Sequence, residues 1–431
     1  MKIVIVGAGS KDFGRGQIVD VLQAQELRGR DVTLSLVDVN EAALDLMARF
    51  AERVKAHTGS DVRIESATDR REALPGANYV ITSVARYRYE LWEQDFRVPL
   101  AHGFRHCLGE NGGPGALFHA LRSFELVIPV CRDVEELCPD ALLLNFTNPE
   151  ARVLHAICHL TKVKAAGICH GVFATINLIA RSLGRPADDL QIVSAGMNHF
   201  FHVSEVIDKK TGENLVAEAM DRAREDDAVR RNPLYQKMME IFGLFSYPSD
   251  DHIGEYVSYG SEFPGVKWRY GRECRPVRLA SPGDAGPALE DYAAGRVPLD
   301  ETVLRPSGEI TVPIICDVEL DRGKFRPAVN VLNAGFYIEN LSPTGVVEIP
   351  AVVDRHGIHP IVVGPLPEPI AAMIRLQHSI HDLLTEAYRT GSRRLLLQAL
   401  LLDPVVDGIV AAEAMLDEML ELQRDFLPTF S

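Results

Sequence analysis

KIVIVGAGS, residues 2–10, joins a strand-like apolar run to a turn of small residues, and a helical pattern follows. Small residues at such a turn let the backbone approach a pyrophosphate at the helix N-terminus. Gly7 and Gly9 fill the first two positions of the usual GxGxxG pattern, but the third is Asp12, with Gly14 two residues further on. The stretch therefore predicts a dinucleotide-binding strand and turn with a modified loop. The alternative is that both glycines only make a tight turn from strand to helix.

The next predicted strand, near residues 32–38, ends in Asp38. A carboxylate at this point accepts hydrogen bonds from the ribose hydroxyls of NAD and repels the 2′-phosphate of NADP, so we expect NAD as the cofactor. Ser10 and Lys11 are expected to contact phosphate oxygens. Their alternative roles are a helix cap for Ser10 and a solvated charge for Lys11.

Apolar strands alternate with amphipathic helices up to about residue 200. The predicted strands lie near 2–7, 32–38, 77–84, 140–145, 163–168 and 190–197, and the predicted helices near 14–28, 40–57, 116–137, 149–160 and 171–183. This alternation predicts an α/β fold with a Rossmann-type, doubly wound parallel sheet.

The rest of the chain is interpreted as a second, α+β domain. One helical stretch is expected at about 215–243, then polar loops to about 308, strands within 329–365 and helices within 366–428. At 431 residues the chain exceeds the length at which single cores usually split. We therefore expect an NAD-binding domain at 1–197 and a substrate-binding and oligomerisation domain at 198–431.

The net charge of −15 and the scattered cysteines indicate which partners and which cellular compartment to expect. An acidic surface repels the phosphates of nucleic acid, and no apolar run approaches the ~18 residues of a membrane helix. Seven cysteines without a CxxC pair suit a reducing compartment rather than a disulfide framework. Because the first strand begins at Lys2, a cleavable signal peptide has no room, and we expect a cytoplasmic protein whose partner is a small molecule.

Polar clusters follow three of the later strands. They are FTNP, which contains Asn148, CHG at residues 169–171, and Asn198-His199. Strand carboxyl ends form the ligand crevice of an open α/β sheet, so these side chains are expected to meet beside the nicotinamide. A thiolate and an imidazole are good ligands for a borderline divalent metal, which makes Cys169 and His199 the candidate pair. Taken singly, they are typical of a buried thiol and a hydrogen-bonded core histidine.

The order of these motifs resembles glycoside hydrolase family 4, whose members depend on NAD and a divalent metal. The residues that carry the resemblance span nearly the whole chain and are the GAGS turn, the acidic second strand, TNP, CHG and GxNHF. Weaker matches are the glycine-rich stretch 109–115 with Leu121-Arg122, Asp250-Asp251-His252 with Glu255, and VEIP at 347–350. Many members carry Asp-Thr where this chain has Glu110-Asn111, and Arg where it has His119, which leaves the substrate subset open.

The resemblance implies hydrolysis by a redox route. NAD+ takes a hydride from C3 of the sugar and acidifies the C2 proton, a base removes that proton, the C1 group leaves, water adds, and the hydride returns. A Mn2+-like ion held by Cys169 and His199 would polarise the C3 ketone. Asn148 would orient the sugar hydroxyls beside the cofactor, and His170 and Asn198 would contact the sugar. The alternative for His170 is a role in supporting the loop.

The resemblance also supplies an acid and a base. Asp250 is expected as the base at C2 and Glu110 as the acid for the leaving group, with Tyr256 and Tyr259 as reserve bases. The alternative for Asp250 is a helix cap after the preceding Pro-Ser pair.

The stretch KWRYGRECRPVR, residues 267–278, is basic within an acidic protein. A charge run is typical of a solvated face. If two of its arginines, Arg275 among them, face the pocket, they would form bidentate bonds to a carboxylate or sulfonate at C6. Arg86 is a further candidate contact. α-Galacturonides and sulfoquinovosides, the latter cleaved by related NAD-dependent sulfoquinovosidases, are therefore candidates beside neutral α-glucosides and α-galactosides.

An NAD-dependent 2-hydroxyacid dehydrogenase of the lactate or malate type is the main alternative, because it shares the expected Rossmann half. Such enzymes have no metal-ligand cysteine, so Cys169 and His199 discriminate. A second alternative is an NAD sensor without chemistry, in which replacing Cys169 would change nothing. The apolar helices after residue 366 and the resemblance predict a homodimer or homotetramer.

Overall fold

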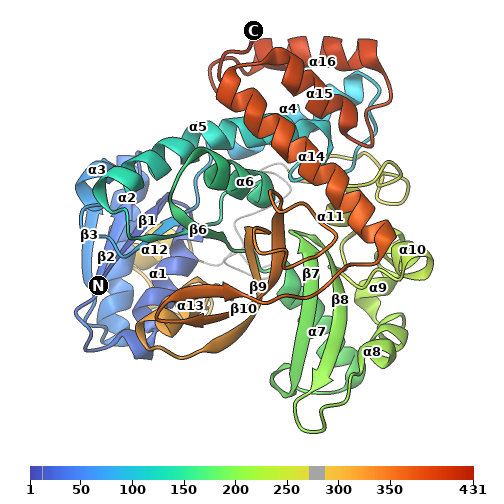
Figure 1. Ribbon diagram of the computed structural model, residues 1–431. Helices are drawn as coiled ribbons and strands as arrows, with labels where there is room; N and C mark the ends of the chain where they lie inside the picture. Colours follow the sequence, from blue (N-terminus) through green and yellow to red (C-terminus); the bar gives the residue numbers. More distant parts are fainter. Residues whose placement is uncertain (12, 271–286) are drawn as a thin grey trace.

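The computed structural model describes residues 1–11, 13–270 and 287–431. Six parallel strands form the first part of its sheet, in the order β3-β2-β1-β4-β5-β6. They are β1 (Lys2–Val6), β2 (Thr33–Val37), β3 (Arg63–Ala67), β4 (Tyr79–Thr82), β5 (Leu142–Asn145) and β6 (Lys164–Gly167). Helices lie on both sides of these strands, with α5 and α6 on one side and α1 on the other (Figure 1). The predicted doubly wound parallel sheet is confirmed.

The helices that connect these strands lie close to their predicted positions. They are α1 (Phe13–Gln23), α2 (Glu41–Thr58), α5 (Gly113–Leu137), α6 (Glu150–Leu160) and α7 (Gly171–Leu183). In α2, the side chain of Asn40 accepts the N–H of Ala43 at the start, and Gly59 adopts a left-handed conformation at the end. The short α3 (Arg70–Ala73) and the longer α4 (Arg88–Ala101) were not predicted.

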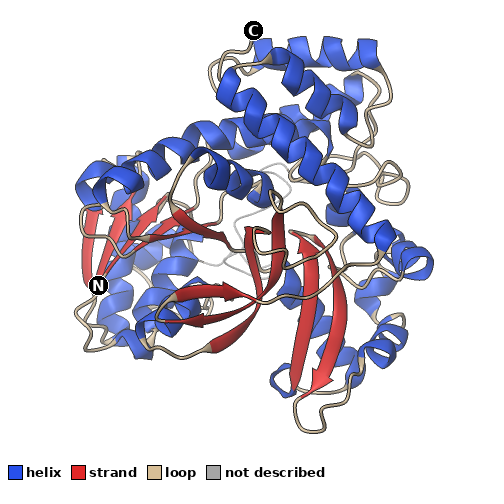
Figure 2. Ribbon diagram, in the orientation of Figure 1, coloured by secondary structure: helices blue, strands red, loops and turns tan. Residues whose placement is uncertain are grey.

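The second part of the sheet is antiparallel and continues directly from the first. Its strands are β7 (Leu190–Met197), β8 (Phe200–Asp208), β9 (Lys324–Leu332), β10 (Val346–Asp354) and β11 (Gly357–Pro360). β6 pairs with β9 where Gly167 faces Asn330, and the order continues β9-β10-β7-β8, so the strands form one band (Figure 2). The prediction that residues 190–197 join the parallel sheet was wrong. β7 turns back at once into β8 through Asn198 and His199, and a hairpin of this kind is necessarily antiparallel.

The remaining helices come mainly from the second half of the chain. They are α8 (Val216–Ala223), α9 (Asp227–Arg230), α10 (Pro233–Phe242), α11 (Asp250–Gly254), α12 (Leu289–Ala293), α13 (Thr311–Glu319), α14 (Glu368–Thr390), α15 (Arg393–Leu402) and α16 (Ile409–Leu422). The single helix expected at 215–243 was wrong, because Asp226 caps a new helix and Pro233 begins another. α14 packs on α6, and α16 packs on α4. Among the described residues, no helix combines the length and apolar character that crossing a membrane requires.

Candidate functional site

The turn after β1 packs so closely against the rest of the chain that two of its glycines leave no space for a side chain. Gly7 has a φ of +92°, and a Cβ there would lie 2.0 Å from the carbonyl oxygen of Ser83. A Cβ on Gly14 would lie 2.2 Å from the carbonyl oxygen of Ala8, so Gly14 provides the close helix–strand approach that the third glycine of the usual pattern provides. The residues of this turn therefore fit a bound pyrophosphate.

Asp38 closes the other side of this turn. Its Oδ2 accepts the N–H of Gly9 at 2.8 Å, and its Oδ1 accepts the N–H of Asn40 at 2.9 Å. Each carboxylate oxygen keeps a second lone pair, so the side chain can still accept ribose hydroxyls. Ser10 instead caps α1, accepting the N–H of Phe13 at 3.2 Å, and Lys11 pairs with Glu290 at 2.6 Å. The structure thus gives Ser10 its alternative role and pairs Lys11 with a carboxylate, and the phosphate contacts of both stay a prediction.

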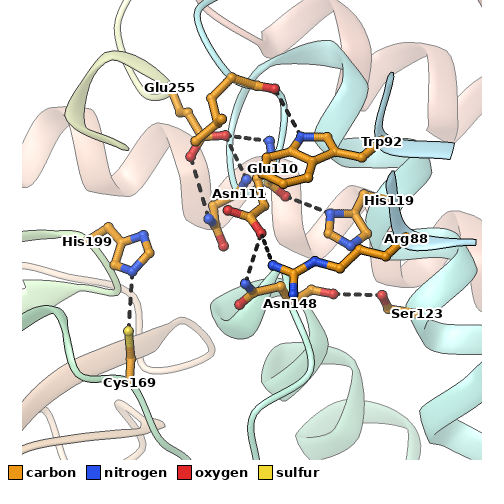
Figure 3. A network of polar contacts seen from close by, with 11 residues as sticks. Arg88, Trp92, Glu110, Asn111, His119, Ser123, Asn148, Cys169, His199 and Glu255 are labelled. Carbon is orange, nitrogen blue, oxygen red and sulfur yellow. Dashed lines mark hydrogen bonds and ion pairs between the residues drawn. The ribbon is translucent and has the colours of Figure 1, made fainter. Parts of the chain in front are cut away.

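Cys169 and His199 meet near the junction between the parallel and antiparallel parts of the sheet, and Figure 3 shows their side chains in contact. The Sγ of Cys169 lies 3.2 Å from the Nε2 of His199. Cys169 follows β6, and His199 sits in the β7–β8 turn with a φ of +63°, a left-handed conformation that a non-glycine residue adopts only when its surroundings require it. The Nδ1 of His199 has no hydrogen-bond partner in the described part of the chain. This thiol and imidazole, already in contact, fit a divalent metal.

Burial changes the protonation of both groups. It lowers the pKa of His199 to about 3, with His170 adding to the effect, so the imidazole is neutral at pH 7 and can offer a lone pair. Burial, together with Glu348, raises the pKa of the Cys169 thiol well above its usual range. A bound cation would reverse this effect on the thiol, because a coordinated thiol loses its proton.

Two carboxylates that sequence reasoning did not assign lie beside this pair. Glu348, on β10, accepts hydrogen bonds from the amides of Asn198 at 3.3 Å and Asn330 at 3.2 Å, and burial raises its pKa to about 7. Glu309 lies 2.9 Å from the Nδ1 of His170. Asn198 is therefore a buried support of the pair, whereas 62% of the His170 side chain is exposed, so it is open to a ligand.

Glu110 lies across from the cysteine and histidine, in a second group of polar residues (Figure 3). Its Oε1 is 3.3 Å from the Nη2 of Arg88 and accepts the amide N–H of Asn148 at 3.2 Å. The carbonyl oxygen of Asn148 accepts the hydroxyl of Ser123 at 2.6 Å, and His119 contacts the backbone oxygen of Glu110 at 3.0 Å. The structure thus brings the expected acid and the expected sugar-orienting amide together.

Glu255 holds the backbone of the loop that carries Glu110. Its Oε1 accepts the N–H groups of Glu110 at 2.6 Å, Asn111 at 2.7 Å and Gly112 at 3.2 Å. Burial, followed by repulsion from Glu110, raises the pKa of Glu255 to about 8, although the three amides oppose that shift. Glu255 is the last residue of the D-x-H-x-x-E segment, to which the sequence assigned no role. The structure shows that it holds the loop that carries Glu110, the candidate acid.

The raised pKa of Glu255 predicts a loss of stability as pH rises. The folded protein holds an extra proton between the ordinary pKa of 4.5 and about 8, so the free energy of unfolding falls across this window, by about 1.4 kcal/mol per pH unit at most for one carboxyl. Denaturant unfolding between about pH 7 and 8 should show the fall. Glu255→Gln keeps the acceptor for the three amides and should flatten it, whereas Glu52→Gln, on the exposed face of α2, should not. An unchanged slope in Glu255→Gln would contradict the assignment.

The candidate bases differ in their surroundings. The hydroxyl of Tyr256 donates to the carbonyl oxygen of Asn198 at 3.1 Å, directly beside the cysteine–histidine pair. Asp250 accepts the backbone N–H groups of Leu234 at 3.1 Å and Tyr235 at 2.9 Å, so its carboxylate caps the first turn of α10, a helix other than its own. Tyr259 donates to the sulfur of Met238 at 3.6 Å.

Arg152 is a buried cation that the sequence did not reveal. Its side chain is 1% exposed, and its three guanidinium nitrogens have no hydrogen-bond partner in residues 1–11, 13–270 and 287–431. It lowers the pKa of Tyr256, although burial and Glu255 together raise that pKa well above its usual range. Arg152 therefore favours the charged form of the tyrosine.

The expected anion contacts are placed only in part. Arg86 is exposed and lines a hollow of about 260 Å³ with Arg88, His119 and Ser123. Arg275 lies outside the described residues. Only residues 267–270 of the basic stretch belong to the described residues. Among them, Trp268 packs edge-on against Trp92 of α4, with ring centroids 5.4 Å apart, so this part of the stretch covers α4 and does not only face solvent.

Comparison with known proteins adds independent findings. The model of the family 4 glycosyl hydrolases matches residues 2–185, and the model of their C-terminal domain matches residues 194–406. The chain is 30% identical to an α-glucosidase of Erwinia rhapontici, over 99% of this chain and 98% of that protein. It is also 30% identical to an α-galactosidase of Bacillus subtilis, over 100% and 99%.

The fold is similar to that of a 6-phospho-α-glucosidase from gut microorganisms, solved in complex with NAD and Mn2+. The TM-score is 0.82 at 21% identity, and the match covers 100% of this chain and 99% of that one.

Proposed function

The chain belongs to the family 4 glycosyl hydrolases, and we propose that it hydrolyses α-glycosides with NAD+ and a divalent metal ion, for which Mn2+ is the expected choice. The observation that carries the proposal is the 3.2 Å contact between the Sγ of Cys169, which follows β6, and the Nε2 of His199, in the β7–β8 turn. The complex of the structural neighbour with NAD and Mn2+ supports the same pair of cofactors.

Two sets of residues would hold the cofactors. Gly7, Gly9 and Asp38 would hold NAD, and Cys169 and His199 would hold the metal ion. When bound, NAD+ accepts and returns the C3 hydride while the ion serves as a Lewis acid toward the C2 and C3 oxygens of the sugar.

The chain's own side chains would move the protons. Asn148 orients the sugar hydroxyls through its amide. Tyr256, as its phenolate, takes the C2 proton on its phenolic oxygen; burial raises the pKa of Tyr256, and the buried guanidinium of Arg152 opposes that rise. Glu110 gives a proton to the leaving oxygen at C1. We prefer Tyr256 to Asp250 as the base because the Tyr256 hydroxyl lies directly beside the cysteine–histidine pair, whereas Asp250 caps α10.

A screen of aryl α-glycosides, with NAD+, Mn2+ and a reductant present, tests this proposal. Neutral, uronic and sulfonated sugars should be compared in parallel. Cleavage without net NADH, accompanied by uptake of deuterium at C2 from D2O, is the expected result. Accumulation of NADH without cleavage would instead indicate a dehydrogenase, which the fold alone would also accommodate. NAD binding without any turnover would indicate a sensor.

A C6 substituent with a negative charge is a finer part of the proposal. In the hollow beside Glu110, Arg88 pairs with Glu110 and Arg122 pairs with Asp95, whereas Arg86 has no ion pair within the described chain. A guanidinium that is not already paired is the group that a carboxylate, sulfonate or phosphate would recruit.

Replacing Arg86 by glutamine should lower kcat/KM for anionic glycosides by about 10- to 100-fold, because a hydrogen bond to a charged group contributes about 1.5–3 kcal/mol. Activity on the matching neutral glycosides should change little. Arg105→Gln, at an exposed position outside the hollow, controls for the change in net charge. Equal losses on neutral and anionic sugars would remove the role in specificity. The oligomeric state and the cytoplasmic location stay predictions.

A further inference from the structure

A second group of metal-ligand side chains lies where α6 packs on α14, on helices that lie side by side in Figure 1. His155 and His159 are four residues apart on α6 and so share one face, with ring centroids 4.2 Å apart. Asp382, on α14, places its Oδ1 2.8 Å from the Nε2 of His155. One ligand atom from each of the three residues lies within 4.8 Å of the other two.

The second nitrogen of each ring is held by an oxygen, as in known metal sites. The Nε2 of His159 lies 2.9 Å from the carbonyl oxygen of Thr344, which can only accept, so this nitrogen carries the proton and Nδ1 keeps its lone pair. The Nδ1 of His155 lies 2.8 Å from the hydroxyl of Thr385. That hydroxyl can donate or accept, so the His155 proton can shift from Nε2 to Nδ1 and free Nε2 for a ligand.

A further buried histidine lies beside this group, and one of the group's own side chains reaches solvent. His381, 1% exposed, turns its ring to within 6.0 Å of His155 between centroids, and neither of its nitrogens has a partner in the described chain. His155 is also buried, whereas 46% of the Asp382 side chain is exposed. The group is therefore anchored on its inner side and open to solvent on its outer side, which gives an ion a path of entry.

We propose that His155, His159 and Asp382 bind a divalent ion of the zinc class, separate from the pair formed by Cys169 and His199. Two imidazoles and one carboxylate are a common protein ligand set for Zn2+, with water in the fourth position. The ion joins α6 to α14. Because α6 begins two residues after Asn148, the ion also fixes the helix that follows the sugar-orienting loop.

Metal content of the full chain with bound NAD+ tests the proposal, with Zn2+ as the probe. In a Cys169→Ser background, which removes the other pair, one equivalent of Zn2+ is expected to bind and to raise the melting temperature. Adding His159→Ala or Asp382→Asn should abolish both effects, and adding His57→Ala, an exposed histidine on α2, should leave both unchanged. Zinc content and melting shift that survive both substitutions would overturn the proposal.

Cobalt provides a second readout that distinguishes the two sites. Co2+ bound by nitrogen and oxygen gives visible bands without thiolate charge transfer, so these bands should persist in Cys169→Ser and vanish in His159→Ala. His159 is exposed and Asp382→Asn preserves the side-chain shape, so both variants should melt as their parent does without metal. This site and the proposed hydrolysis fail separately, because zinc content, melting shift and cobalt bands are measured without any glycoside, whereas the hydrolysis is tested by glycoside cleavage.

Discussion

Cys169→Ser is expected to lower kcat/KM for every glycoside that the enzyme cleaves by about 10³-fold, because Lewis-acid stabilisation by a metal contributes several kcal/mol. Serine is close to cysteine in size, so the packing around His199 and Gly171 should survive. The hydroxyl does not ionise near neutral pH and is a poor ligand for a borderline metal. Metal content, NAD+ affinity and kcat/KM should be measured together on the same preparation.

The control is Cys138→Ser. Cys138 follows directly after α5, and its replacement should leave metal content, NAD+ affinity and kcat/KM unchanged. NAD+ affinity in Cys169→Ser should stay near that of the parent, since the glycine turn and Asp38 are untouched. A variant that loses Mn2+ but keeps more than about a tenth of its activity would separate the cysteine from the chemistry. A variant that keeps its Mn2+ would show that the thiol is not a ligand.

The sequence predicted the parallel half of the sheet because its strands are nearly continuous apolar runs. The burial of β1 and β2 explains this clarity. β3 was missed because it is an edge strand whose side chains are mostly exposed, so its polar sequence carries no strand pattern. α4 was missed because it mixes buried and polar residues and contains Pro99, which conceals its helical period.

The candidate site was predictable where polar residues follow buried strands. Cys169 and His199 were expected to meet because both of the preceding strands were taken to be parallel. The structure does bring them into contact, but β7 runs antiparallel to β6. The two residues meet because one row of pairs, from Gly167 through Asn330 and Glu348 to Gly196, crosses the sheet beside them.

The order of the strands has no bearing on Glu309, which comes from a loop before α13 and reaches His170 only through tertiary packing. Arg152 could not be found either, because an arginine on an amphipathic helix is normally solvated.

Asp250 shows why a motif does not fix a role. Its place in the D-x-H-x-x-E segment suggested a base, and a cap on its own helix was the alternative. The structure makes it a cap of α10, whose N–H groups of Leu234 and Tyr235 lie sixteen and fifteen residues earlier in the chain. A contact over that distance depends on the whole fold of the segment, and no local pattern encodes it.

Glu110→Gln is expected to produce the second large loss, and its size should depend on the leaving group. Positioned acid catalysis contributes about 10²–10⁴-fold, but only where the departing oxygen needs a proton. Alkyl glycosides should therefore lose about 10³-fold, whereas nitrophenyl glycosides should lose less than about tenfold. Glutamine can still accept from Asn148 through its amide oxygen, so the sugar-orienting contact is preserved.

Glu125→Gln is the control, because Glu125 lies on α5 and lines the hollow beside Glu110 but accepts the hydroxyl of Tyr388 and does not contact the candidate site. It should be active on both kinds of glycoside. A uniform loss in Glu110→Gln would assign Glu110 to positioning through Arg88 and Asn148 rather than to proton transfer. Deuterium uptake at C2 gives the final distinction: it should continue in Glu110→Gln, since proton removal precedes departure of the C1 group, and it should stop in Tyr256→Phe.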